Sequence, residues 1–328
     1  PDIIYLNHGS YGAVPRPVME AYQTWQRRLE AQPVKFLSRD LWGYLESART
    51  SLGEYLHADP DELAFVPNAT TGVNIVARAL QLDPGDEILI SDHEYGASRK
   101  TWEFISQIKG TVCRVQSIPI PVSSPAEILE RIWAGVSPRT RLIFFSHISS
   151  STSLMFPVTA LCQRARQAGI LTMIDGAHAP GQISVDLDVI GPDFYAGNCH
   201  KWMLAPKGAG FLYTRRELQA LIEPLIVSWG WQADPAYSTG SRYLDLLQWM
   251  GTDDPSAYLS VPAAIQFMRE NDWSTVQQYC RDMRRQAARS ISNLTGLPTP
   301  FPLDSIGGYQ MISLPLPTAV DVDVLKEQ

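Results

Sequence analysis

Two polar clusters follow apolar segments of the chain and carry residue types that can act together chemically. Asp175 comes directly after the apolar segment 171–174, His178 follows three residues later, and Lys201 lies in a second cluster at 196–202. A carboxylate at the end of a buried strand is desolvated unless a cation meets it. A lysine with a pKa lowered by desolvation becomes a nucleophile that forms Schiff bases with carbonyl compounds. Taken singly, Asp175 could also cap the following segment, and Lys201 could be a snorkelling side chain.

A third cluster, 67–74, turns an apolar segment into a helix through small and hydroxyl residues, among them Ala69, Thr70 and Thr71. Backbone N–H groups at a helix start, with threonine hydroxyls, form a natural phosphate site. On its own this pattern is more typical of an ordinary N-cap. Together, the three clusters match the needs of pyridoxal phosphate: a lysine for the aldehyde, a carboxylate that keeps the ring nitrogen protonated, and a phosphate site.

The elements that must position these clusters follow from the hydrophobic pattern. Between residues 60 and 215, short apolar segments alternate with amphipathic ones, which indicates a mostly parallel sheet covered by helices on both faces. Ligands bind such sheets at the carboxyl ends of the strands, where all three clusters lie. We expect strands at 64–66, 87–90, 111–117, 141–145 and 171–174, and helices at 71–82, 97–108, 125–136 and 158–168.

The C-terminal part has a different pattern. Helices are expected at 262–271 and 276–294, followed by short strand-like pieces after Pro298. The sequence stops within a helix-like segment at 322–326, so we expect further residues of a second domain beyond Gln328, and the missing initiator Met indicates that the true start lies upstream. Four arginines recur at helical spacing and are interpreted as a solvated face: Arg281, Arg284, Arg285 and Arg289.

Composition excludes several classes of protein. The chain has 328 residues, 45% of them hydrophobic, and a net charge of −7. These values rule out intrinsic disorder and argue against nucleic-acid binding. No apolar run approaches the roughly 20 residues that cross a bilayer, and the first residues do not resemble a signal peptide. The four cysteines are far apart, which disfavours a disulfide framework or a zinc site and predicts a cytoplasmic protein.

Several stretches resemble the class V aminotransferase family of fold-type I pyridoxal phosphate enzymes. The resemblance runs from residue 5 to about residue 265 and favours the isopenicillin N epimerase-like branch, which is related to cysteine desulfurases and cystine lyases. It implies a large domain, 15–255, with a mostly parallel seven-stranded sheet, and a smaller α+β domain made of 1–14 and 256–328. The stretches that carry it are 5–12, 65–74, 92–97, 175–181, 200–202 and 228–231.

The resemblance also implies roles for individual residues. Lys201 would hold the cofactor aldehyde, Asp175 would pair with the ring nitrogen, and His178 would bind the phenolic oxygen. Either Tyr95 or His93 would stack on the ring, because the local alignment is ambiguous. Thr252 after Gly251 would reach the phosphate of the partner subunit, which implies a homodimer with shared sites. The remaining phosphate ligands would be Ala69, Thr70, Thr71, Asn198 and His200.

The reaction is less well specified than the cofactor. The resemblance favours an epimerase-like enzyme acting at Cα of an amino acid or a derived substrate, with Lys201 as base and Tyr95 as a possible second acid. C–S lysis, cysteine desulfuration and transamination stay open as alternatives. The desulfurases' mobile cysteine and carboxylate-binding arginine are not visible, Ser150 replaces their usual Asn, and Cys199 is expected to be packed.

Two alternative functions are a non-enzymatic scaffold and a nucleotide-binding enzyme. A non-enzymatic scaffold is disfavoured by the intact Lys201, Asp175 and His178. A nucleotide-binding enzyme is disfavoured because the sequence has neither G-x-G-x-x-G after the first strand nor G-x-x-x-x-G-K-S/T, the two glycine-rich motifs that bind nucleotide phosphates. Trp202, Trp229 and Trp231 could form apolar walls of the site or pack a dimer interface.

Overall fold

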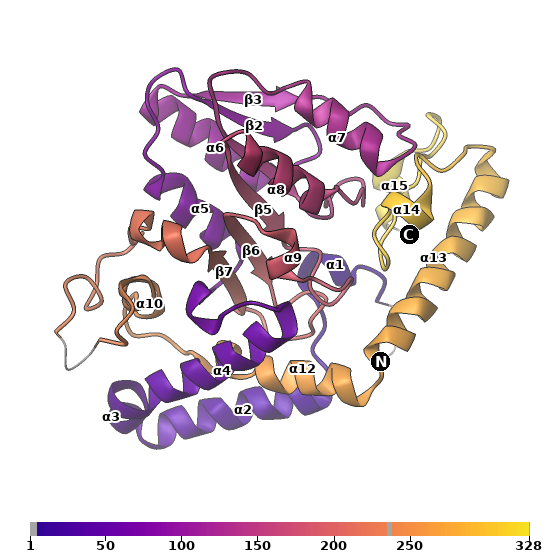
Figure 1. The fold of residues 1–328 in the computed structure, drawn as a ribbon. Coiled ribbons are helices and arrows are strands. Elements are labelled where there is room, and N and C mark those ends of the chain that lie inside the picture. Colours follow the sequence, from indigo (N-terminus) through magenta and orange to yellow (C-terminus); the bar gives the residue numbers. More distant parts are fainter. Residues whose placement is uncertain (1–4, 235–237, 328) are drawn as a thin grey trace.

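A computed structural model describes residues 5–234 and 238–327, and places a seven-stranded sheet at the centre of the molecule (Figure 1). The strand order is β1-β7-β6-β5-β4-β2-β3. β7 runs antiparallel to both of its neighbours, and the other adjacent pairs are parallel. The predicted mostly parallel sheet is therefore confirmed. The strands are β1 Leu63–Val66, β2 Glu87–Ser91, β3 Val112–Gln116, β4 Thr140–Ser146, β5 Leu171–Gly176, β6 Phe194–Asn198 and β7 Gly210–Thr214.

Apart from the edge strand β3, which is largely exposed, the strands are buried on both faces because their side chains alternate between two apolar layers. In β4, Ile143 and Phe145 pack with the helices on one face, while Leu142 and Phe144 pack with those on the other. The first layer uses α2 Arg16–Ala31, α4 Leu41–Leu56, α7 Pro125–Trp133, α8 Val158–Gln167, α9 Leu187–Ile190 and α12 Val261–Glu270. The second uses α5 Ala69–Ala79, α6 Gly96–Lys109 and α10 Arg242–Gln248.

The helices also pack against one another around the sheet. α2, α4 and α12 pack side by side below the sheet, and α13 extends along one side of the molecule (Figure 1). The other elements are α1 His8–Tyr11, α3 Pro33–Lys35, a π-helical turn at Phe36–Asp40, 3-10 helices at Pro60–Glu62 and Arg216–Leu221, α11 Ser256–Leu259, α13 Trp273–Thr295, α14 Leu303–Ile306 and α15 Val322–Glu327.

The C-terminal part departs from the sequence prediction in two ways. The described residues after Pro298 form α14, α15 and irregular backbone rather than strands, and an isolated bridge pairs Gly307 with Leu154. Arg284 is buried, not solvated, and donates to the carbonyl of Gly308. Arg285 forms an ion pair with Asp304. The arginine spacing was misread because two of these side chains fasten the C-terminal segment to α13.

Two further expectations concern the whole chain. The domain limits at 15–255, with 1–14 and 256–328 as a second domain, stay a prediction, and residues 1–4 and 328 lie outside the described part. Among the described residues, no helix is both long and apolar enough to span a bilayer.

Candidate active site

Lys201 and His178 meet beyond the ends of β5 and β6. The Lys201 Nζ lies 3.1 Å from Nε2 of His178, and the indole N–H of Trp202 donates to Nδ1 of His178 at 3.3 Å. A ring nitrogen that accepts a hydrogen bond carries no proton, so neutral His178 is protonated on Nε2. His178 therefore donates to Lys201, and an amine can accept only when it is uncharged.

The charge state follows from burial as well as from this hydrogen-bond pattern. Burial lowers the pKa of Lys201, while the charge of Asp175 raises it. Burial, followed by the charge of Lys201, lowers the pKa of His178 to about 3. Both effects favour the neutral forms of the two side chains. The hydrogen-bond pattern thus indicates an unprotonated lysine amine, the form that attacks carbonyl groups, and burial shifts the pKa of Lys201 in the direction that favours this form.

Asp175 is the residue before the last in β5 and is buried from solvent. Its Oδ1 accepts from the backbone N–H of Ala177 at 3.0 Å, and its Oδ2 accepts from the hydroxyl of Ser98 at 3.1 Å. Burial raises the pKa of Asp175, and the charge of Lys201 is among the effects that lower it. The described residues give this carboxylate no ion pair, so a cationic ligand group would stabilise its charged form.

The start of α5 keeps free donors where a phosphate was predicted. Asn198 accepts from the N–H of Ala69 at 2.8 Å, and the N-cap Asn68 accepts from the N–H of Thr71 at 2.9 Å. Within the described part of the chain, the N–H and hydroxyl of Thr70 have no hydrogen-bond partner. His200 donates from Nδ1 to the carbonyl of Ala209, so its Nε2 can donate to a phosphate only when the ring is charged.

His93 and Tyr95, the two residues predicted to stack on the ring, differ in their hydrogen bonds and in their exposure to solvent. Both nitrogens of the buried His93 are engaged, Nδ1 with Thr152 at 2.9 Å and Nε2 with the carbonyl of Ile118 at 2.8 Å. Tyr95 lies directly before α6 and is 50% exposed. Tyr95 is therefore the side chain with freedom to cover a ring, although its role stays a prediction.

A short N-terminal segment covers the loop that carries the lysine. The Nε2 of His8 lies 3.0 Å from the carbonyl of Lys201, and its ring packs against Trp202. Lys207 donates to the carbonyl of Gly12. Gly12 has φ +73°, and a Cβ there would lie 2.0 Å from the carbonyl oxygen of His200, so only glycine fits. The sequence stretch 5–12 is thus explained by close packing over the lysine loop.

Some predicted residues are not brought to this site by the chain itself. Thr252 lies in an exposed turn after α10 and has no described contact with Lys201. Trp202 is buried beside His178, so it is not a wall of the site mouth, whereas Trp229 is 84% exposed. Cys199 is fully buried, as expected for a packed thiol, and burial raises its pKa.

Three groups beside Asp175 or His178 were not predicted from the sequence. Ser98 lies one turn into α6, and no motif marks it as a partner of a carboxylate in β5. Glu94 is buried, accepts from the N–H of Ser146 at 2.9 Å, and has a pKa raised to about 8, chiefly by burial. Trp202 was predicted to be an apolar wall of the site or part of a dimer interface, and not to donate to His178. These contacts depend on register between strands, which the sequence does not display.

The residues present fit pyridoxal phosphate. An uncharged lysine amine, a buried carboxylate without an ion pair, and an open hydrogen-bond donor at a helix start occupy one edge of the sheet. Within the described residues, each of these groups lacks a partner that the cofactor would supply. The aldehyde would bind the lysine amine, the protonated ring nitrogen would pair with the carboxylate, and the phosphate would accept from the donor at the helix start.

Comparisons with known proteins agree with this fit. The profile of the family described as Aminotransferase class-V matches residues 4–310. Isopenicillin N epimerase of Amycolatopsis lactamdurans is 39% identical over 336 residues, covering 99% of this chain and 84% of that protein. A probable chloroplastic L-cysteine desulfhydrase of Arabidopsis thaliana is 29% identical, covering 99% of this chain and 72% of that protein.

The fold agrees as well. C-DES, solved as a mutant with glycine covalently linked to its pyridoxal phosphate cofactor, has a TM-score of 0.74 and 24% identity, covering 87% of this chain and 77% of that chain. The matched family profile spans most of the chain, and the epimerase similarity extends over nearly all of it. The chain belongs to the aminotransferase class-V family, whose members depend on pyridoxal phosphate.

Proposed function

We propose that the protein is an isopenicillin N epimerase-like enzyme that acts at Cα of an amino acid or an amino-acid-derived substrate. The observation that carries this proposal is the uncharged amine of Lys201, held by His178 and close to the buried Asp175. The similarity to isopenicillin N epimerases over 99% of the chain supports the choice of reaction.

The proposed roles follow from the contacts. When bound, pyridoxal phosphate supplies an electron sink for negative charge at the substrate Cα. Lys201 takes the Cα proton, because the uncharged form of its amine is a base and burial, which lowers its pKa, favours that form. Asp175 holds a proton on the ring nitrogen, with Ser98 and the Ala177 N–H fixing its orientation. His178, held by Trp202, orients the lysine amine and binds the phenolic oxygen.

The phosphate ligands are proposed on the same basis. Thr70 offers its N–H and hydroxyl, and His200 offers Nε2 once the ring is protonated. Ala69, Thr71 and Asn198 shape the helix start around them, since the N–H of Ala69 donates to Asn198 and the N–H of Thr71 donates to the N-cap Asn68, which fixes the backbone of the first turn. Tyr95 covers the exposed face of the ring and supplies the second acid that epimerisation needs.

A C–S lyase acting on cysteine or cystine is the second candidate. The 29% identity to a probable L-cysteine desulfhydrase over 99% of the chain favours it. A desulfurase fits less well, because Cys162 and Cys199 are buried and burial raises both thiol pKa values. Transamination shares the same first step, and only the products separate it from the other two.

Proton exchange and product analysis test the proposal. The purified enzyme with cofactor is incubated in deuterated water with candidate amino acids, including cysteine and cystine, with Lys201→Ala as control. We expect Lys201-dependent deuterium at Cα and inverted amino acid without keto acid. Pyruvate released from cysteine or cystine much faster than any racemisation would replace the epimerase by the lyase, and a stoichiometric pyridoxamine form would indicate an aminotransferase.

We also propose a homodimer with shared active sites. The segment after the second 3-10 helix exposes large apolar side chains, Ile226, Val227, Trp229 and Trp231, as an interaction surface does. Thr252, in the bend after α10, is also exposed. Burial of these side chains against a second copy would remove them from water and bring Thr252 to the partner's phosphate.

The cytoplasm is the proposed location. The four cysteines are free thiols in the structure, at Cys113, Cys162, Cys199 and Cys280, as is usual in a reducing compartment.

A further inference from the structure

A cavity of about 640 Å³ lies at the opposite end of the sheet from Lys201. Asp61, on its wall, comes just before β1, and Arg216 comes just after β7. Leu63 of β1 pairs with Tyr213, whereas the other end of β7, Gly210, pairs with Asn198 near the lysine loop. The cavity is therefore separated from the proposed catalytic centre by the length of these strands.

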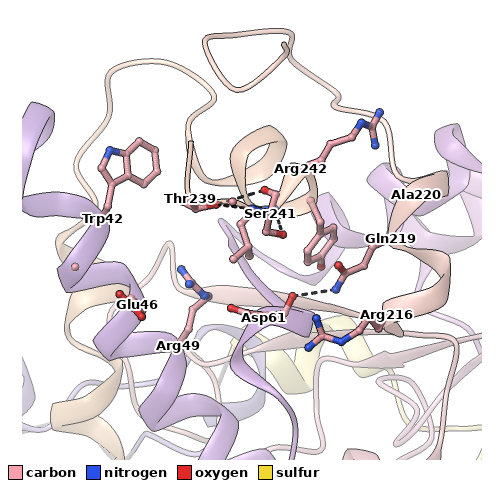
Figure 2. A pocket seen from close by; sticks show the side chains of 14 residues that line it. Trp42, Glu46, Arg49, Asp61, Arg216, Gln219, Ala220, Thr239, Ser241 and Arg242 are labelled. Atoms are coloured by element: carbon pink, nitrogen blue, oxygen red, sulfur yellow. Dashed lines mark hydrogen bonds between the residues drawn. The ribbon is translucent and has the colours of Figure 1, made fainter. Parts of the chain in front are cut away.

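Arg49 reaches into this cavity from α4 without a charged partner. Figure 2 shows its guanidinium between Glu46, Asp61 and Ser241. The side chain is 4% exposed, its Nε donates to the carbonyl of Pro60 at 3.2 Å, and its buried Nη1 has no hydrogen-bond partner in the described residues. Burial lowers its pKa, but an arginine stays protonated in proteins. A buried, unpaired guanidinium is costly, and such a group calls for a ligand or a bound water.

Two carboxylates beside Arg49 are also unpaired. The charges of Asp61 and Glu46 raise the pKa of Arg49, yet within the described residues neither carboxylate forms an ion pair or accepts a hydrogen bond; side chains donate only to the backbone carbonyls of these two residues. The other arginines of the wall are already engaged, Arg216 with Asp59 and Arg242 with Glu223. Among the described residues that line the cavity, the charged groups without an ion pair are thus the guanidinium of Arg49 and the carboxylates of Glu46 and Asp61.

We propose that this cavity binds a small α-amino acid as a zwitterion. The ligand carboxylate accepts from the guanidinium of Arg49, and the ligand ammonium donates to Glu46 and Asp61. A simple anion would meet the two carboxylates, and a simple cation would meet the guanidinium, whereas a zwitterion matches both signs. The cavity volume leaves room for a side chain as well. The inference is independent of the reaction at Lys201.

Glycine binding to the enzyme with cofactor tests this site. The bound cofactor is first reduced with borohydride, which blocks amine exchange at the lysine, and labelled glycine is titrated by equilibrium dialysis. We expect one glycine per chain, with affinity about tenfold or more weaker in Arg49→Gln and Glu46→Gln. Glu46 is exposed and unpaired, so its substitution leaves the fold intact. Arg39→Gln, an exposed arginine just before α4, is the matched control and should bind like the wild type.

Three results would each overturn the proposal. One is glycine binding that is absent, or equal in the wild type, Arg49→Gln and Glu46→Gln. The second is acetate binding as tightly as glycine and unaffected by Glu46→Gln, which would leave a plain anion site. A crystal structure that places only water, or a side chain of a second copy, on Arg49 at high glycine concentration would count in the same way.

Discussion

The lysine loop and the segment between β7 and α11 differ in how far the chain completes them by itself. Around Lys201, polar atoms find partners within one chain: His178 with Trp202, and Asp175 with Ser98. Between 226 and 231, by contrast, the large apolar side chains of Ile226, Val227, Trp229 and Trp231 face solvent.

The lysine loop holds the groups proposed for catalysis, whereas the exposed segment is proposed to form the contact with a second chain. The groups proposed for proton transfer are oriented by burial and by register between β4, β5 and β6, so one chain is enough to set their pKa values. The exposed segment has no such support, and apolar side chains left in water mark an interface. Substitutions in the first region should therefore act on chemistry, and those in the second on assembly.

Replacing Lys201 is the largest expected perturbation of the first region. Lys201→Ala removes the amine that holds the cofactor and takes the Cα proton, so turnover should fall by about 10⁴-fold. The visible absorption band of the lysine-bound cofactor should vanish with it. Lys207→Ala is the matched control, because this lysine binds the Gly12 carbonyl rather than the site. A band that persists, with borohydride fixing the cofactor to another lysine, would refute the assignment.

Asp175→Asn tests the buried carboxylate next. The amide keeps the size of the side chain but cannot hold a proton on the ring nitrogen, so turnover should fall about 10²- to 10³-fold while some cofactor stays bound. Steady-state kinetics and the cofactor absorbance measure the two effects separately. Ser98→Ala, which removes one hydrogen bond to the same carboxylate, should cost less. Wild-type rates in Asp175→Asn would remove this residue from the mechanism.

The second region is tested by subunit complementation. Thr252→Trp should lower turnover by about 100-fold, because a bulky side chain displaces the cofactor phosphate in the partner. Mixed with Lys201→Ala under exchange conditions, it should restore about a quarter of the sites, since half of the dimers are mixed and each has one intact site. Activity that does not return although exchange is verified would mean that each chain closes its own site.

Trp202→Phe is a finer probe of the lysine loop. It keeps the ring packed on His8 but removes the donor to Nδ1 of His178, so the histidine loses the bond that places its proton on Nε2. We expect turnover to drop about tenfold, with a changed pH profile. Nitrogen-15 chemical shifts of His178 report the tautomer directly. Unchanged shifts would show that something other than Trp202 sets the proton position.

The sequence predicted more of the fold than of the contacts. Continuous apolar strands and the polar residues that follow them placed Asp175, Lys201 and the α5 start at one edge, because strand ends converge in a parallel sheet. It could not show that Ser98 or Trp202 would serve these groups, since their partners lie on other elements. Arg284 was misread for the same reason: helical spacing looks alike whether the face meets water or a returning chain.

The smallest expected effect is a pH dependence of stability from the histidines of the first region. Burial lowers the folded-state pKa of His178 to about 3 and that of His147 to about 4, whereas both return to about 6.5 on unfolding. At pH values between the folded-state and unfolded-state pKa values, the unfolded chain binds more protons than the folded chain. The free energy of unfolding is therefore highest above about pH 6.5 and decreases as the pH falls. The cofactor-free protein should lose several degrees in Tm between about pH 7 and pH 5. His178→Gln keeps an acceptor for Trp202 but cannot titrate, so its Tm should fall less steeply; equal slopes in circular dichroism melts would mean that His178 is already charged in the folded state.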